Sequence, residues 1–424
     1  MGHNDGQPFK GQRMKALWLS SVQLSEKKLL GSGTWVPGML AILKQYFPEL
    51  EIVNLTKARV SSPVKINCGK FSEWIIPTSE KMTSDVVKNI HNVIKQEKPD
   101  VIQVWGTEDI WGLFPFKEYF SQIPYILEIQ GILASVSEEY YGGLTPWDLI
   151  KCWNIKECIK PSSSLPAIRR LYTKNIGRER LILENTANIG VQSDWSASVV
   201  KTYNPTARLY RSGIAIRPAF YQSAKWAPGD RTQVTVFSTA LMGQPLKGAY
   251  ILFKAFAIIR QRYPDAQLVL AGAKEDGLRR SGFCRMLTRF ARKHNFLNAI
   301  HQLGILDASN LAEQYRRSSV FVNPSNWESY SVVTAESMYI GCPTVAAYSG
   351  ALPELGENNS VLYFPKGDYR ICASHVIDIL DNLDLAKNLS FKSIAVAERR
   401  QDRYHIAANQ LNTYKQLIEN HQKN

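Results

Sequence analysis

With 424 residues, the chain is too long for a single comfortable hydrophobic core and predicts two domains. Its composition, with 45% apolar and 21% charged residues, is that of a soluble globular protein, and no apolar run reaches the roughly 18–20 residues that a bilayer-spanning helix needs. The net charge of +14 is spread over both halves and is compatible with three partners: nucleic acid, an anionic membrane surface or a phosphorylated substrate.

The first thirteen residues are polar, and a short apolar stretch follows from Met14. This stretch is too short for a signal peptide and no small-residue cleavage site follows it, so residues 1–13 are predicted to be a disordered leader or a segment that is not native. The six cysteines form no C-x-x-C pair and show no zinc-like spacing with histidine. They predict reduced thiols in a cytoplasmic protein and no metal site.

Strands and helices alternate in the first half, which is the pattern of a parallel sheet covered by helices on both faces. Helices are expected at residues 39–46 and 84–97. A glycine-bearing loop, Gly31-Ser32-Gly33-Thr34, follows the first strand and is a candidate for binding a diphosphate or a second substrate. The expected strands are residues 15–21, 51–55, 99–105, 124–129 and a further strand and turn within 185–195.

The second half begins after a linker at residues 211–218 and repeats the alternation. Helices are expected at 249–261, at 281–294 and over the last 30 residues. Ligands bind at the carboxyl ends of the strands in open parallel sheets, so two such sheets with facing loop edges predict a cleft between the domains. The expected strands are residues 234–238, 267–271, 300–303, 320–323 and 343–347.

The stretch from residue 321 to residue 336 is the most informative part of the chain. A short apolar strand ends before Pro324, and a helix is expected to open at about Ser329–Ser331. Eight positions of helical spacing place Glu328 and Glu336 on broadly the same side, about 12 Å apart along the axis. The free amides of residues 330–332 would then suit a diphosphate, with one acid for hydroxyls at either end of a nucleotide-sugar. The alternative is an ordinary helix with an acidic first turn.

Two further turns carry weaker signals. Lys247 and Gly248 precede the helix 249–261, which places a cation beside a helix N-terminus, although a lone lysine there is more often solvated. The glycine-bearing loop from Ser349 to Glu354 follows the strand that ends at residue 347. Its amides could meet a phosphate or a sugar, and it is equally acceptable as a plain turn.

Together these segments resemble the retaining glycosyltransferases of family 4, which have the GT-B fold. The resemblance covers nearly all of residues 14–424 and is strongest over 234–365. Each motif alone is weak, but their occurrence in the family's order is highly specific. The motifs are Lys247-Gly248, Gln302-Leu303-Gly304, Pro324-Ser325, Glu328 with Glu336, Gly341-Cys342-Pro343 and Gly350 to Glu354.

The resemblance implies an α/β architecture of two Rossmann-like doubly wound domains that face each other across a cleft. The first, on the acceptor side, would span residues 14–215, and the second, which binds the nucleotide-sugar, residues 216–398. The helical segment 399–424 would cross back and pack on the first domain. Its apolar stripe needs a partner surface, because an isolated helix of this length is marginal.

The resemblance also implies roles for individual residues. Glu328 would contact the hydroxyls of the donor sugar, Lys247 the phosphates and Glu336 the ribose hydroxyls. Family members cleave nucleotide diphospho-sugars with retention and need no metal or cofactor, so the donor itself would be the only nucleotide required. The absence of a D-x-D pair is consistent with this. Further donor contacts are predicted at Ser329, Tyr330, Ser331, Val332, Gly304, Ile305 and Arg217.

Two positions depart from the family pattern. Members usually carry an arginine shortly before the lysine, and residues 237–246 contain no basic residue, so either Lys247 acts without it or Arg211 or Arg217 fills the gap. Gln130, a predicted catalytic residue, stands where a histidine is common. A glutamine can donate and accept hydrogen bonds but cannot titrate, which leaves proton transfer at this position in question.

A narrower resemblance, carried by residues 128–131 and 217–221, is to enzymes of bacterial cell-surface polysaccharide synthesis (capsule, O-antigen or exopolysaccharide). Residues 145–180 combine eight basic residues with Trp147 and Trp153, a pattern typical of a segment at an anionic bilayer surface. We therefore expect a lipid-diphosphate-linked saccharide acceptor and a cytoplasmic protein peripheral at the inner face of the membrane. In the alternative, both tryptophans pack in the core and the charges are ordinary surface.

Three other functions compete with this interpretation. A sugar-nucleotide epimerase or phosphorylase could use the same fold, although the paired glutamates and the Lys-Gly turn fit a transferase better. A nucleic-acid-binding protein is suggested by the net charge and by Arg285, Arg289 and Arg292 at i, i+4 and i+7, yet no recognition motif accompanies them. An inactive scaffold is kept open by the missing arginine.

Overall fold

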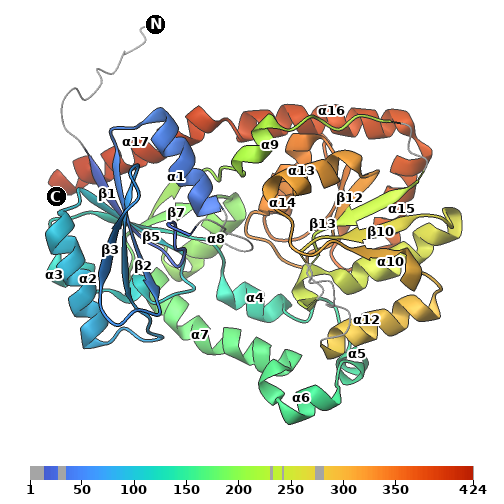
Figure 1. Ribbon diagram of the computed structural model, residues 1–424, viewed down its shortest axis with the longest axis horizontal. Helices are drawn as coiled ribbons and strands as arrows, with labels where there is room; N and C mark the ends of the chain where they lie inside the picture. Colours follow the sequence, from blue (N-terminus) through green and yellow to red (C-terminus); the bar gives the residue numbers. More distant parts are fainter. Residues whose placement is uncertain (1–13, 27–34, 230–232, 241–242, 273–280, 424) are drawn as a thin grey trace, which may run out of the picture.

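The computed structural model describes residues 14–26, 35–229, 233–240, 243–272 and 281–423. Two α/β domains lie side by side, and a long helix at the C-terminus runs from the second domain back over the first (Figure 1). The predicted architecture of two doubly wound domains with a returning helix is confirmed. The predicted loop Gly31-Ser32-Gly33-Thr34 and the segment 1–13 lie outside the described residues.

The first domain contains an eight-stranded sheet with the order β3-β4-β2-β1-β5-β6-β7-β8, in which only β3 runs antiparallel to its neighbour. Its central strand β5 is fully buried, as expected for a strand covered on both faces. Strands β3, β4 and β8 were not predicted. The strands are β1 (Lys15–Leu19), β2 (Glu51–Ala58), β3 (Val64–Asn67), β4 (Ser72–Pro77), β5 (Val101–Trp105), β6 (Tyr125–Glu128), β7 (Asn188–Val191) and β8 (Arg208–Arg211).

Helices cover both faces of this sheet. The longest of them, α7, begins at the side-chain cap of Ser164, which accepts a hydrogen bond from the Ala167 amide. The helices are α1 (Trp35–Tyr46), α2 (Ser84–Glu97), α3 (Phe116–Tyr119), α4 (Leu133–Glu139), α5 (Pro146–Lys151), α6 (Ile155–Ile159), α7 (Leu165–Asn185) and α8 (Asp194–Tyr203).

The second domain contains a six-stranded parallel sheet with the order β11-β10-β9-β12-β13-β14. The strand β14 at its edge was not predicted. The strands are β9 (Thr235–Ser238), β10 (Gln267–Leu270), β11 (Ile300–Gln302), β12 (Val320–Asn323), β13 (Thr344–Tyr348) and β14 (Leu362–Pro365). The helices are α9 (Pro218–Gln222), α10 (Ala249–Arg262), α12 (Gly282–Lys293), α13 (Ala308–Arg317), α14 (Val332–Ile340), α15 (Tyr369–Asp381), α16 (Leu383–Arg400) and α17 (Arg403–Gln422).

The returning helix α17 is anchored in the core of the first domain by a buried polar cluster. The hydroxyl of Tyr414, a fully buried residue, accepts a hydrogen bond from Trp18 Nε1 at 2.9 Å and donates one to the side-chain oxygen of Gln103. Gln410 donates to the same oxygen at 3.2 Å. Because β1 and β5 supply Trp18 and Gln103, this cluster fixes the helix against the middle of the first sheet.

A second connection between the domains lies on the opposite side of the molecule, where α5 contacts α12 (Figure 1). The amide of Gly282 donates to Glu157 Oε1 at 2.9 Å, and Lys366 forms a 2.6 Å ion pair with Glu139. Tyr140 and Cys152 are buried with the hydrophobic core of the second domain. Residues 140–157 thus extend from the first domain onto the second.

We expect Tyr414→Phe to lower the free energy of unfolding by about 1–3 kcal/mol, because it leaves the buried Trp18 Nε1 and Gln103 oxygen without this partner. Thermal and chemical denaturation would measure the loss. The control is Tyr404→Phe on the same helix, where the ring is 58% exposed and a change within about 0.5 kcal/mol is expected. Equal stability of the two variants would contradict the anchoring role of the cluster.

Candidate active site

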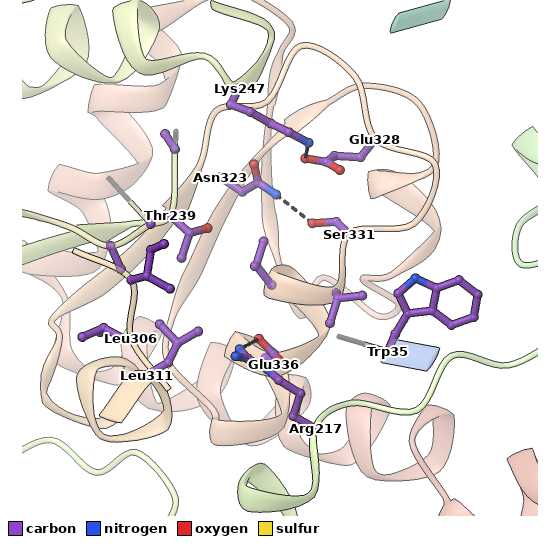
Figure 2. Close-up of a pocket in the computed structure, with 16 residues that line it drawn as sticks. Trp35, Arg217, Thr239, Lys247, Leu306, Leu311, Asn323, Glu328, Ser331 and Glu336 are labelled. Atoms are coloured by element: carbon purple, nitrogen blue, oxygen red, sulfur yellow. Dashed lines mark hydrogen bonds and ion pairs between the residues drawn. The ribbon is translucent and has the colours of Figure 1, made fainter. Parts of the chain in front are cut away.

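A pocket of about 370 Å³ lies at the carboxyl edge of the second sheet (Figure 2). Its floor is formed by residues at or just after the ends of three strands that are neighbours in the sheet. These residues include Thr239 after β9, Gly272 after β10 and Asn323 at the end of β12. Trp35, at the start of α1, reaches the pocket from the first domain. The pocket therefore occupies the edge at which parallel sheets bind ligands, and both domains contribute to it.

Glu328 and Glu336 both line this pocket, but helical spacing does not bring them together. Helix α14 begins only at Val332, so Glu328 lies in the loop between β12 and α14, and the expected helix start at Ser329–Ser331 was wrong by one to three residues. The cause is the left-handed conformation of Ser331, whose φ of 81° interrupts the helix before it can reach Glu328. The loop, rather than two helical turns, carries Glu328 to the pocket.

The backbone of Glu328 is held by the glycine-bearing loop after β13. The amide of Ala351 donates a hydrogen bond to the Glu328 carbonyl at 2.8 Å. A Cβ atom at Gly350 would lie 2.1 Å from the same carbonyl oxygen, so a larger residue would push the loop away. The loop at residues 349–354 thus supports the pocket through the Glu328 backbone and does not line the pocket itself.

At one end of the pocket, Lys247 forms an ion pair with Glu328, with 2.8 Å between Nζ and Oε1 (Figure 2). Both side chains are largely covered without being fully buried. The turn that presents Lys247 depends on Gly248, which has a φ of +74° and whose Cβ would meet the Pro324 carbonyl at 1.8 Å. The pair leaves donors of the ammonium and acceptors of the carboxylate available to a ligand.

At the other end, Arg217 donates two hydrogen bonds to the Glu336 carboxylate, of 2.7 Å from Nε and 2.8 Å from Nη2 (Figure 2). Glu336 is 0% exposed, and burial raises the pKa of its carboxyl while the Arg217 guanidinium opposes this rise. Arg217 therefore does not fill the gap beside Lys247 left by the missing arginine. Arg211 does not fill it either, because it pairs with Asp194 in the first domain.

Helix α14 presents its N-terminal turn to the pocket between these two ion pairs. Ser331, Val332 and Val333 line it, and the Ser331 hydroxyl accepts a 3.0 Å hydrogen bond from Asn323 Nδ2. Tyr330 does not line the pocket, because its buried hydroxyl accepts a hydrogen bond from Gln401 Nε2 at 2.8 Å behind the loop. The side chain of Tyr330 thus faces away from the pocket, and the predicted contact through its backbone amide stays a prediction, while Ser331 and Val332 line the pocket.

The remaining predicted donor residues lie around this frame. Ile305 lines the pocket together with Leu306 and Leu311, which gives this wall an apolar surface. Gly304 lies behind it, where its carbonyl accepts a hydrogen bond from the Gly272 amide at 2.7 Å. Gly304 is thus a support for the neighbouring loop rather than a lining residue.

Gln130 and Ser329 meet where the two domains touch. The Ser329 hydroxyl donates a 2.5 Å hydrogen bond to the backbone carbonyl of Gln130, which follows β6 in the first domain. Neither residue lines the pocket. The hydrogen bond between Ser329 and Gln130 holds the Glu328 loop against the carboxyl edge of the first sheet. Gln130 therefore lies next to the loop that lines the pocket, and not in the pocket itself.

Several lining residues were not predicted from the sequence, among them Asn323, Thr239 and Trp35. Trp35 directly follows the Gly31–Thr34 loop and packs edge-on against Trp105, with ring centroids 4.9 Å apart. Its place after a glycine-bearing loop was the one available signal. Among the described residues, no three His, Cys, Asp or Glu side chains lie close enough together to hold a metal ion.

Comparison with known sequences points to the same part of the chain. Residues 232–382 match the family model described as glycosyl transferases group 1. The D-inositol 3-phosphate glycosyltransferase of Corynebacterium urealyticum is 26% identical over 313 residues, 67% of this chain and 69% of that protein. The protein of the same name from Pseudarthrobacter chlorophenolicus is 28% identical over 240 residues, 53% of each chain.

A phosphatidyl-myo-inositol mannosyltransferase of Propionibacterium freudenreichii is 25% identical over 189 residues, 44% of each chain. In the D-inositol 3-phosphate glycosyltransferases of P. chlorophenolicus, Catenulispora acidiphila and Saccharomonospora viridis, the match spans about half of the relative's length. The sequence likeness is therefore concentrated in one part of these proteins.

Solved structures extend the likeness to the whole fold. The sucrose-phosphate synthase of Thermosynechococcus elongatus superposes with a TM-score of 0.71 at 16% identity, over 96% of this chain and 100% of that one. HepE of Anabaena, in complex with UDP and glucose, superposes with a TM-score of 0.64 at 16% identity, over 95% and 99%. The second domain thus carries the group 1 glycosyl transferase signature, and the chain has the GT-B fold.

We expect Glu336→Gln to raise the KM for a nucleotide-sugar at least tenfold, because the neutral amide holds Arg217 and ligand hydroxyls less strongly than a carboxylate does. The fold should remain intact, which circular dichroism would confirm. Glu313→Gln is the control, since Glu313 also pairs with arginine, in its case Arg316 and Arg317, but on the exposed face of α13. An unchanged KM in the Glu336 variant would remove Glu336 from the donor site.

Proposed function

We propose that this protein is a retaining, metal-independent glycosyltransferase that moves a sugar from a nucleotide diphospho-sugar to a saccharide acceptor. The observation that carries this proposal is the pocket itself. A cation–carboxylate pair stands at each end of it, and the N-terminal turn of α14 lies between them. The sequence match over residues 232–382 and the names of the relatives support a sugar-transferring activity.

The pocket has a place for each part of such a donor. The apolar wall of Ile305 and Leu306 suits the nucleobase, and Glu336 at the same end can accept hydrogen bonds from ribose hydroxyls. A carboxylate has about four acceptor positions, of which Arg217 uses two. The turn at Ser331–Val333 then meets the diphosphate, and Lys247 with Glu328 meets the terminal phosphate and the sugar. HepE, solved with UDP and glucose, supports a uridine nucleotide as the first donor to try.

This arrangement favours attack from the same face as the leaving group. Both pocket carboxylates are paired with cations, which lowers their reactivity as glycosyl nucleophiles. In the step we propose, the acceptor oxygen bonds to the anomeric carbon as the bond to the phosphate oxygen breaks, and the hydroxyl proton passes to the leaving phosphate. Lys247 stabilises the charge that develops on the departing diphosphate.

The central test is transfer chemistry with and without the Lys247 ammonium. Purified protein should release a nucleoside diphosphate from a matching nucleotide-sugar, and Lys247→Ala should lower kcat at least a hundredfold, because the neighbouring arginine of the family is missing. Lys254→Ala, which removes a lysine on α10 beside Tyr250, is the control. Release of free sugar 1-phosphate, or an epimerised nucleotide-sugar, would identify a phosphorylase or an epimerase instead.

The proposed acceptor is a lipid-diphosphate-linked saccharide, and the surface of α5 and α6 supports this. Trp147 is 73% exposed and Trp153 is 52% exposed, so the alternative in which both tryptophans pack in the core is wrong. Asp148 on the same helix points inward, where it forms a capping box with Thr145. The acid faces the protein and the aromatic rings face solvent. We refer to residues 147–160 of this region as the α5–α6 surface.

The α5–α6 surface joins apolar and basic side chains in the manner of a bilayer-docking face. Ile150, Ile155 and Ile159 are each at least 60% exposed, and Lys151 and Lys160 are exposed beside them. Exposed apolar groups of this size on a small surface are uncommon in a protein that stays in water. Within the described ranges, no helix has the length and apolar composition needed to cross a bilayer. We therefore propose peripheral binding at the inner face of the membrane.

The proposed setting, bacterial surface polysaccharide synthesis, rests on this surface and on the narrower sequence resemblance alone. The sequence relatives named above carry the names of enzymes that act on inositol phosphate or on a phosphatidylinositol lipid, and these names mention no surface polysaccharide. The lipid in the mannosyltransferase's name fits an acceptor that is reached at a membrane.

Vesicle flotation tests the membrane part separately. Wild-type protein should float with vesicles that contain phosphatidylglycerol, and less so as salt is raised from 0.1 to 1 M. Trp147→Ser combined with Trp153→Ser should abolish flotation without loss of stability, because both rings are exposed. Phe391→Ser, which removes an equally exposed ring on α16, is the control. Failure of the wild type to bind anionic vesicles at low salt would place the acceptor in solution.

A further inference from the structure

A carboxylate of the first domain stands close to the donor pocket and has no role in the chemistry described above. Glu108 follows β5, and Gln130 with Gly131 follows β6, the neighbouring strand of the sheet. These two segments therefore lie next to each other at the carboxyl edge of the first sheet. Gln130 in turn contacts the Glu328 loop through Ser329, so Glu108 lies on the wall that faces the second domain.

The backbone leaves space for the Glu108 carboxylate in a notch between two glycines. A Cβ atom at Gly106, which has a φ of +88°, would lie 2.2 Å from one carboxylate oxygen. A Cβ atom at Gly131 would lie 2.8 Å from the other oxygen. A Cβ atom at Gly106 would also lie 3.3 Å from the carboxamide carbon of Gln130, so the side chains of Gln130 and Glu108 lie beside each other. Two glycines, each in the segment that follows one of two neighbouring strands, thus make room for one carboxylate.

The charged groups around Glu108 have other partners. Asp109 pairs with Lys57 and accepts a 2.6 Å hydrogen bond from Ser21. Glu179 on α7 accepts hydrogen bonds from Thr107 and from the amides of Leu133 and Ala134 at the start of α4. Arg178 donates to the backbone carbonyl of Glu108, not to its carboxylate. Among the residues that the structure describes, no side chain is paired with the Glu108 carboxylate.

The surroundings also make this carboxyl titrate near neutrality. Burial of the group, followed by the charge of Glu179, raises the pKa of Glu108 to about 7, although backbone hydrogen bonds from Glu108 itself, Gly131 and Thr107 oppose the rise. Glu108 as a whole residue nevertheless remains exposed to solvent. A side chain with a shifted pKa, on an exposed residue that lies beside a pocket, is a candidate for binding a ligand.

We infer that Glu108 binds the attacking hydroxyl of the acceptor, and that the unit carrying this hydroxyl is an uncharged sugar or polyol. This inference rests on the proposed transfer reaction. An ionised carboxylate accepts a strong hydrogen bond from a hydroxyl, whereas it repels a phosphate, and Glu179 behind it adds to that repulsion. Any phosphate of the acceptor would then lie away from the notch, as it does in a saccharide that is attached to a lipid through a diphosphate.

The experiment measures binding of simple acceptor mimics to protein saturated with UDP. The neutral probes are the methyl glycosides of glucose, galactose, mannose and N-acetylglucosamine, together with myo-inositol. The charged probes are glucose 6-phosphate and D-inositol 3-phosphate. Saturation-transfer NMR titrations at pH 6 and pH 8 give the dissociation constants for the wild type, Glu108→Gln and the control Glu138→Gln, an exposed glutamate on α4.

We expect at least one neutral probe to bind the wild type more tightly at pH 8 than at pH 6, because the carboxylate replaces the carboxylic acid as the pH rises through 7. Glu108→Gln should weaken this binding at pH 8 about fivefold or more and remove the pH dependence, while Glu138→Gln changes neither. The glutamine variant keeps the shape of the side chain and removes a charge that is costly in this position, so it should fold.

Three results would overturn the inference: tighter binding of the phosphorylated probes than of the neutral ones, no binding of any neutral probe, or unchanged binding in Glu108→Gln. Calorimetry with UDP alone separates these results from a failure of the proposed function. If UDP binds the wild type and Glu108→Gln equally, the donor site stands and only the acceptor inference is decided. If UDP does not bind the wild type, the proposed function itself fails.

Discussion

The buried ion pair between Arg217 and Glu336 is the constraint on which the arrangement of the donor pocket depends. Glu336 is wholly buried, and an ionised carboxylate without a partner in such a place costs several kcal/mol. Arg217 offsets that cost, but it belongs to the linker that joins the two domains and directly precedes α9. The charge in the donor pocket therefore fixes the point at which the linker enters the second domain.

The same linker is tied to the C-terminal helices and to the loop that carries Glu328. The amide of Ile216 donates to the side-chain oxygen of Gln401, whose amide nitrogen donates to the buried hydroxyl of Tyr330. Close by, Gly213 lies so near Ile406 of α17 that a Cβ atom would meet it at 2.9 Å. Linker, returning helix and donor loop are thus connected through fully or partly buried groups. A ligand that changes the loop would also bias the position of one domain relative to the other.

The sequence predicted the parts of this structure that depend on local pattern, and it missed those that depend on distant neighbours. The central strands and α17 were predicted because an unbroken apolar run or an amphipathic stripe is compatible with few local structures. Strand β3 at the edge of the sheet and its neighbour β4 both mix polar with apolar residues, and the left-handed Ser331 gives no signal in the sequence. The partners of Glu336 and Tyr330, which are Arg217 and Gln401, lie 119 and 71 residues away along the chain. Spacing along the chain could not reveal them.

Basic and acidic side chains lie in different parts of the cleft. Basic side chains are available at the donor pocket, through Lys247, and on the α5–α6 surface, through Lys151 and Lys160. Between the domains, the wall that we propose for acceptor binding instead presents Glu108 with Glu179 behind it. A phosphate is attracted to the first two places and repelled from the third, while a hydroxyl is favoured there. The donor phosphates and those of a membrane-bound acceptor would therefore be kept on opposite sides of the reacting hydroxyl. The charged side chains that keep the phosphates apart do not need to touch the bond that forms. It is enough that the two sheets and the linker between them hold these side chains in place.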